Sequence, residues 1–106
     1  MNDLDICKKV ADIEGIKYWN HLDKCVLKAP WGWDKELPEY NPLTDDGLCL
    51  RLIEKYGVTF NIYHDLDGIK YYYGDFWRDG ERIIIPDRQD LKRFVCLYVI
   101  ELNTGK

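Results

Sequence analysis

The most constraining feature of this sequence is a run of seven residues near its C-terminal end, Phe94 to Ile100, that leaves no polar face. We expect a helix from Leu91 to Leu102, and a helix that is apolar on nearly all sides is either central to a core or pressed against a partner subunit. A domain of this size is expected to be too small to surround one helix completely. The run therefore predicts a homodimer interface, with a deeply buried helix or, from its β-branched content, a strand as alternatives. The expected interface residues are Phe94, Leu97, Tyr98 and Ile100.

A second helix is predicted over residues 42–57. Thr44 is suited to cap its first turn, Asp45 and Asp46 place negative charge at the positive end of the helix dipole, and Gly57 suits a left-handed end. The apolar residues of this stretch recur at three- and four-residue spacing, which gives the helix one apolar side. They are Leu48, Cys49, Leu52, Ile53 and Tyr56.

The N-terminal part of the chain predicts a further helix and a weaker hairpin. Over residues 2–14, Asn2 can cap the helix, Asp5 can complete a capping box, and Gly15 can close it. Residues 16–29 then carry a strand-turn-strand pattern.

Period-two alternation between residues 58 and 85 predicts a three-stranded antiparallel meander, with turns at Asp67-Gly68 and Asp79-Gly80. We expect Pro86 to end the last strand and Asp87 to cap the helix that follows. Three adjacent isoleucines before Pro86 are typical of a strand covered on both faces. The sequence therefore predicts one α+β domain over residues 1–106, in which three helices and an antiparallel sheet are layered α/β/α.

Composition narrows the classes of function. The net charge is −4 and the isoelectric point is about 5.1. This acidic balance makes nucleic acid an unlikely partner, because a sequence-independent binder needs a basic surface. The N-terminus lacks the order of a signal peptide, and the longest apolar run is too short to span a bilayer, so we expect no membrane partner and a cytoplasmic location.

Candidate catalytic and metal-ligating residues are few. The chain contains no Ser, and no glycine-rich loop that would cradle a phosphate. His64, Asp65 and Asp67 lie where a hairpin turn is expected, and turn chemistry explains them better than a metal site. Buried, reduced thiols are the preferred interpretation of the cysteines, over a disulfide or zinc. We therefore expect no enzyme activity, no cofactor and no metal. The cysteines are Cys7, Cys25, Cys49 and Cys96.

Aromatic residues are the remaining signal, at 14% of the chain. One group lies in an irregular segment rich in proline, residues 30–42, and the other lies in the predicted meander, where one face would carry an aromatic strip and Tyr72 would lie on the opposite face. Both groups suit either core packing or recognition of a partner. The candidate binding residues are Trp31, Trp33, Tyr40, Tyr71, Tyr73 and Trp77.

The order of these elements resembles a known family. The carriers of the resemblance are Glu14-Gly15, the segment of residues 39–46 that leads into the helix at residues 48–55, the strands, and the final helix at residues 90–97. The whole resembles the phage ABA sandwich domain family, small proteins of bacteriophages and prophages. The resemblance implies a phage origin and a helix-sheet-helix layering, and it carries over no catalytic residue.

The expected function is that of a non-enzymatic phage- or prophage-encoded accessory protein, which binds a host or phage protein in the host cytoplasm and modulates host or defence machinery. The alternative is a small-molecule or nucleotide-binding protein, in which the aromatic residues stack on a flat ligand and Lys70, Arg78 or Arg82 meets its charge.

Overall fold

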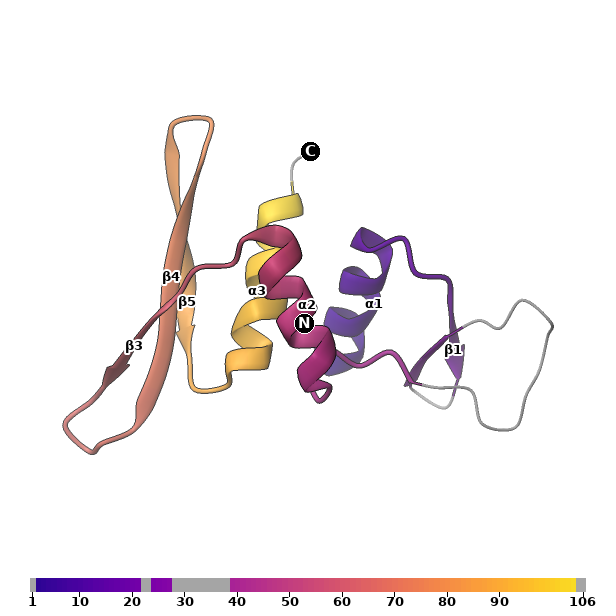
Figure 1. The fold of residues 1–106 in the computed structure, drawn as a ribbon, viewed down its shortest axis with the longest axis horizontal. Helices are drawn as coiled ribbons and strands as arrows, with labels where there is room; N and C mark the ends of the chain where they lie inside the picture. Colours follow the sequence, from indigo (N-terminus) through magenta and orange to yellow (C-terminus); the bar gives the residue numbers. More distant parts are fainter. Residues whose placement is uncertain (1, 22–23, 28–38, 105–106) are drawn as a thin grey trace.

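Three helices stand on one side of a three-stranded antiparallel sheet in the computed structural model (Figure 1). The structure describes residues 2–21, 24–27 and 39–104. Its elements, in chain order, are α1 (Asp3–Ile13), β1 (Tyr18–His21), β2 (Lys24–Leu27), α2 (Asp46–Tyr56), β3 (Asn61–His64), β4 (Lys70–Arg78), β5 (Glu81–Arg88) and α3 (Leu91–Asn103). The predicted α+β fold is confirmed. None of these helices is long and apolar enough to cross a membrane.

The predicted caps of α1 are confirmed. The backbone N–H of Asp5 donates to Asn2 Oδ1 at 2.8 Å, and the Asp5 carboxylate accepts from the Asn2 backbone, which completes the capping box. Gly15 follows the helix with a φ of +67°. The capping box depends only on neighbouring residues, and here the sequence alone was enough to locate it.

The predicted cap of α2 is wrong by one residue. The carboxylate of Asp45, not the hydroxyl of Thr44, accepts from the helix, at 3.1 Å from the Leu48 nitrogen. Asn41 explains the shift, because its backbone carbonyl accepts from the N–H groups of Thr44 and Asp45 and holds both in a turn ahead of the helix. Gly57 ends α2 in the left-handed conformation, as predicted.

The start of α3 also differs from the prediction. β5 continues through Pro86 to Arg88, with a register shift where it pairs with β4. Asp87 therefore lies within the strand, and Asp90 caps α3 by accepting from the backbone of Lys92 at 3.0 Å. Proline is tolerated at irregular positions of an edge strand, which is where Pro86 lies.

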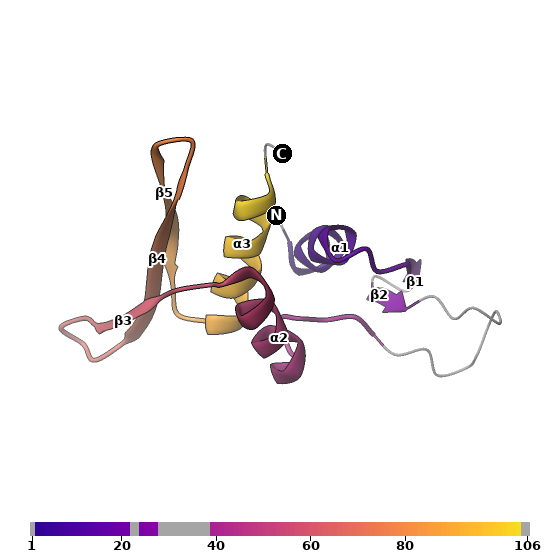
Figure 2. The ribbon, with the colours of Figure 1, turned by 45° about the horizontal axis from the view of Figure 1, so that its top comes forward.

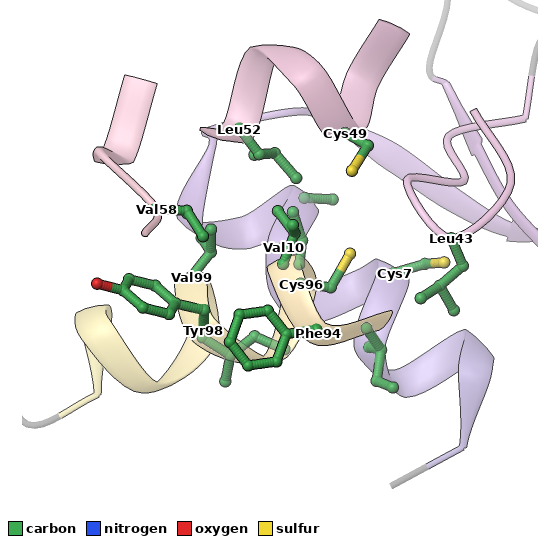
Figure 3. Packing of buried hydrophobic residues seen from close by; sticks show 14 of the residues in the cluster. Cys7, Val10, Leu43, Cys49, Leu52, Val58, Phe94, Cys96, Tyr98 and Val99 are labelled. Atoms are coloured by element: carbon green, nitrogen blue, oxygen red, sulfur yellow. The ribbon is translucent and has the colours of Figure 1, made fainter. Parts of the chain in front are cut away.

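Helix α3 is central to the core, which is the buried-helix alternative of the prediction, and the structure gives no support to the dimer interface predicted on it. Phe94, Tyr98 and Ile100 are buried by the protein's own elements, and Leu97 is half-buried. The sheet covers one side of α3, where the rings of Tyr98 and Phe76 lie 5.3 Å apart. Helices α1 and α2 cover the other side (Figure 3). Two helices and a sheet are enough to enclose one helix, even in a domain of this size.

The sheet has the order β3-β4-β5, and its antiparallel meander was predicted. The predicted α/β/α layering is wrong for this sheet, because α1, α2 and α3 all lie on the same side of it (Figure 2). Ile83 and Ile85 of β5 pack toward α3, whereas Ile84 between them is 64% exposed. The three isoleucines thus follow the ordinary alternation of a strand that is buried on one face only.

β1 and β2 pair antiparallel in a separate two-stranded sheet, from Tyr18 opposite Leu27 to His21 opposite Lys24. The turn of the hairpin predicted here lies outside the described residues. The buried Cys25 of β2 accepts a backbone hydrogen bond from Tyr40 at 2.7 Å. That bond ties the approach to α2 to this small sheet.

Gly74 permits the closest approach between the sheet and the chain that leads into it. A Cβ atom at this position would lie 2.7 Å from the carbonyl oxygen of Thr59 and 3.2 Å from Cζ of Phe94. Only a residue without a side chain lets the connection from α2 pass β4 at this distance.

Glu14 joins α1 to α2 through a nearly buried carboxylate, whose side chain is 3% exposed. It accepts hydrogen bonds from Lys55 Nζ at 2.5 Å and from the Tyr56 hydroxyl at 2.8 Å. Burial acts to raise the pKa of Glu14, but these two bonds and the charge of Lys55 outweigh burial and hold the pKa below its usual value. The folded state therefore favours the charged form of Glu14.

Replacing Glu14 by Gln is expected to lower the free energy of unfolding by about 1–3 kcal/mol at neutral pH. Because the folded state lowers the pKa of Glu14, its contribution is present above the unfolded pKa of about 4.3 and is lost as the pH falls through the folded value. Urea unfolding of both proteins between neutral and acidic pH measures the difference. Glu54→Gln, at an exposed position of α2, is the control. A Glu14→Gln deficit that stays constant down to acidic pH would contradict the assignment.

Candidate functional site

The sheet presents an outer face, which we define as the face of β3, β4 and β5 that points away from α3 (Figures 1 and 2). Alternate residues of a strand point to opposite faces. Tyr72 and Phe76 of β4 point toward the helices, where they pack on the core. The odd-numbered residues of β4 therefore lie on the outer face, together with the residues of β3 and β5 that pair with them. The residues of the outer face are Asn61, Tyr63, Tyr71, Tyr73, Asp75, Trp77, Arg82 and Ile84.

Three tyrosines form a cluster at one end of the outer face. The rings of Tyr63 and Tyr71 stack at 5.1 Å, and the ring of Tyr73 meets Tyr63 edge-on at 5.4 Å. The Tyr71 hydroxyl donates to Asp65 Oδ2 at 3.3 Å. Aromatic pairs in these geometries stabilise one another. The cluster is therefore held in place by contacts within the protein itself.

The other end of the outer face combines apolar surface with an ion pair. Trp77 is 71% exposed and Ile84 is 64% exposed. Between them, the Arg82 guanidinium donates to the carboxylate of Asp75. A hollow of about 120 Å³ lies here, lined on the outer face by Asn61 and Tyr73 as well as by this pair and Ile84.

The predicted aromatic strip of the meander lies as the sequence indicated. Tyr71, Tyr73 and Trp77 share the outer face, and Tyr72 lies on the opposite one. Sequence reasoning did not include Tyr63 or Ile84 in this strip. The period-two alternation of residues 59–63 was a sufficient signal for Tyr63, whereas the assumption of a sheet covered on both faces hid Ile84.

The predicted binding residues of the irregular segment, residues 30–42, do not lie on the outer face as far as the structure describes them. Trp31 and Trp33 lie outside the described residues. Tyr40 is buried, with 4% of its surface exposed, and burial raises the pKa of its hydroxyl. Its prediction as a binding residue is therefore wrong, because its ring fills the core where the approach to α2 joins β2.

Only one of the three expected cations lies on the outer face. Arg78 Nη1 donates to the carbonyls of Glu101 at 2.7 Å and Thr104 at 2.6 Å, so it satisfies the C-terminal end of α3. Lys70 Nζ lies 5.2 Å from the centre of the Tyr72 ring, which belongs to the opposite face. Arg82 alone is positioned to meet a charge that approaches the outer face.

The acidic cluster that follows β3 builds a turn. Asp65 Oδ1 accepts from the backbone N–H groups of Asp67 and Ile69, both at 2.9 Å. Gly68 completes the turn with a φ of +79°. Within the described part of the chain, no group of three or more His, Cys, Asp or Glu side chains could hold a metal ion.

The four cysteines are free and buried, as predicted. Burial is the main cause that raises their pKa values, that of Cys7 to about 11 and that of Cys96 to about 12. Cys49 and Cys96 lie in the core between α2 and α3 (Figure 3). A thiol is nucleophilic only as the thiolate, so these side chains are positioned for packing and not for chemistry.

We expect the four thiols of the folded protein to react with a disulfide reagent at pH 8 at least about 100-fold more slowly than in urea, because burial both hides them and disfavours the thiolate. Timed absorbance of the released thiolate dye measures both rates. A stoichiometric fast phase in the folded protein would show that one thiol is accessible and reactive.

No family model, no curated protein and no solved structure matches this chain. The resemblance to the phage ABA sandwich domain family therefore remains a prediction from the residues.

Proposed function

We propose that this is a non-enzymatic binding protein, made by a phage or prophage, that docks on a host or phage protein through the outer face of its sheet. The single observation that carries the proposal is the exposure of Trp77, Tyr73, Tyr63 and Ile84 together on that face. Monomeric proteins rarely leave large apolar side chains gathered on one surface unless that surface meets something.

The composition of the face favours a protein as the occupant. Tyr, Trp and Arg are the residues most enriched where truncation weakens protein complexes, and the outer face carries all three types. The Asp75–Arg82 pair supplies polar groups beside the apolar surface, as at the rim of an interface. The phage or prophage origin and the host cytoplasm as location rest on the family resemblance alone. Modulation of host or defence machinery is the effect that such docking would have.

Truncating the outer face is expected to weaken binding of its partner. In pull-downs with the tagged protein from lysate of the bacterial host, Trp77→Ala and Tyr73→Ala should each raise the Kd of the captured partner by about 30-fold, since central aromatic residues contribute roughly 2 kcal/mol. Leu50→Ala is the matched control, because Leu50 is 56% exposed but lies on α2.

The proposal fails if the folded protein captures no specific partner, or if the partner binds the Trp77→Ala and Leu50→Ala variants equally. Circular dichroism of each variant establishes that the fold is intact before the comparison is made.

A second candidate function is the binding of a small flat ligand at the hollow beside Tyr73. Arg82 lies there as a cation next to an aromatic ring, in the manner expected for an anionic aromatic ligand. At about 120 Å³ the hollow is smaller than the 300 Å³ or more of typical ligand sites, so it suits a single ring and not a whole nucleotide.

A thermal-shift series with nicotinate and benzoate tests this candidate. Binding should raise the Tm once the ligand exceeds its Kd, and Arg82→Gln should abolish the rise. An unchanged Tm at millimolar ligand would remove the candidate and leave the protein-binding proposal intact.

A further inference from the structure

Strand β4 is longer than the strand that pairs with it on one side. β3 covers β4 only from Lys70 to Tyr73, whereas β5 pairs with β4 as far as Arg78. Within the described part of the chain, no strand pairs with the β3 side of β4 beyond Tyr73. The connection from α2 crosses β4 near its middle, and the half toward the turn at Asp79-Gly80 extends past it (Figures 1 and 2).

The register shows which backbone groups lie along this open edge. Asp79 and Gly80 form a two-residue turn with φ values of +52° and +81°, the geometry in which the flanking pair exchanges both backbone hydrogen bonds. The direction of the backbone groups alternates along a strand. The N–H and C=O groups of Phe76 and Gly74 therefore point toward β5, as those of Arg78 do. The N–H and C=O groups of Asp75 and Trp77 therefore point to the open edge.

The opposite edge of the sheet is interrupted beyond Ile85. On β5, Pro86 offers no N–H, and the register shift between β4 and β5 interrupts the strand. Prolines and bulges are the usual means by which proteins prevent strand addition. The segment Asp75–Arg78 of β4 carries neither.

We propose that the open edge of β4 pairs antiparallel with the same edge of a second copy of this chain. With Phe76 on the two-fold axis, Asp75 lies opposite Trp77 of the second copy, and each such pair can exchange two backbone hydrogen bonds. In this antiparallel pairing no two like charges lie directly opposite each other. A parallel in-register pairing would instead place Asp75 of one copy beside Asp75 of the other. The pairing continues the ladder that β3 leaves at Tyr73.

The resulting dimer extends the outer face across both copies. Along one row of side chains, Arg82 and Trp77 of the first copy are followed by Asp75 and Ile84 of the second. Each exposed Trp77 ring would lie between a guanidinium and a carboxylate, which covers part of its apolar surface. Because the paired segment is short, we expect a dimer that forms reversibly in the high micromolar range, about 100–500 µM.

Amide hydrogen exchange, followed by NMR on the unmodified protein over a concentration series up to about 1 mM, tests the pairing. The amides of Asp75 and Trp77 should become protected as the concentration rises, whereas those of Phe76 and Arg78, which already bond to β5, should be protected throughout. Unprotected Asp75 and Trp77 amides at the highest concentration would overturn the proposal.

Two substitutions at one position separate backbone pairing from side-chain contact. Trp77→Ala removes the ring and should weaken the dimer less than ten-fold, whereas Trp77→Pro also removes the N–H on the open edge and should leave a monomer in sedimentation equilibrium. Equal association of the two variants would overturn the proposal. If Trp77→Pro fails to fold, the hydrogen exchange of the Asp75 and Trp77 amides in the unmodified protein decides whether the open edges pair. Neither result depends on the proposed partner, and Tyr73→Ala tests the binding of that partner without changing the open edge.

Discussion

The burial of helix α3 is the constraint on which the rest of the structure depends. Its side chains from Phe94 to Ile100 offer no polar face, so every side of the helix must be covered. Helices α1 and α2 cover one side, and the sheet covers the other. One face of the sheet packs against α3, and no helix of the described chain covers the other face. The exposed aromatic surface is thus a direct result of how the core is closed.

The two faces of β4 lie in different surroundings. Tyr72 and Phe76 stabilise the core, while Tyr73 and Trp77, one residue further along, remain exposed. A substitution on the outer face of this strand removes little buried surface, so it should cost little stability. The side chains of such a face can change over evolutionary time without loss of the fold.

Several local signals were predicted correctly from the sequence, whereas the caps of α2 and α3 were misplaced and long-range contacts were not predicted. The capping box of Asn2, the left-handed Gly57 and the alternation of β4 depend on residues close in sequence, and each was confirmed. The ion pair of Glu14 with Lys55 joins residues that are 41 positions apart, and nothing in the sequence indicates it. The same limit applies to α3, because amphipathicity shows that a surface must be covered but not which elements cover it.

The contact at Gly74 has a consequence for tracing the ancestry of this protein. A side chain at that position would collide with the backbone of Thr59, and a backbone atom cannot be exchanged for a smaller one by mutation. Core residues can be repacked and surface tyrosines can be replaced, so both drift as sequences diverge. A glycine in the middle of the second strand of the meander should persist when they have changed. It offers a marker by which distant homologues of this chain can be recognised.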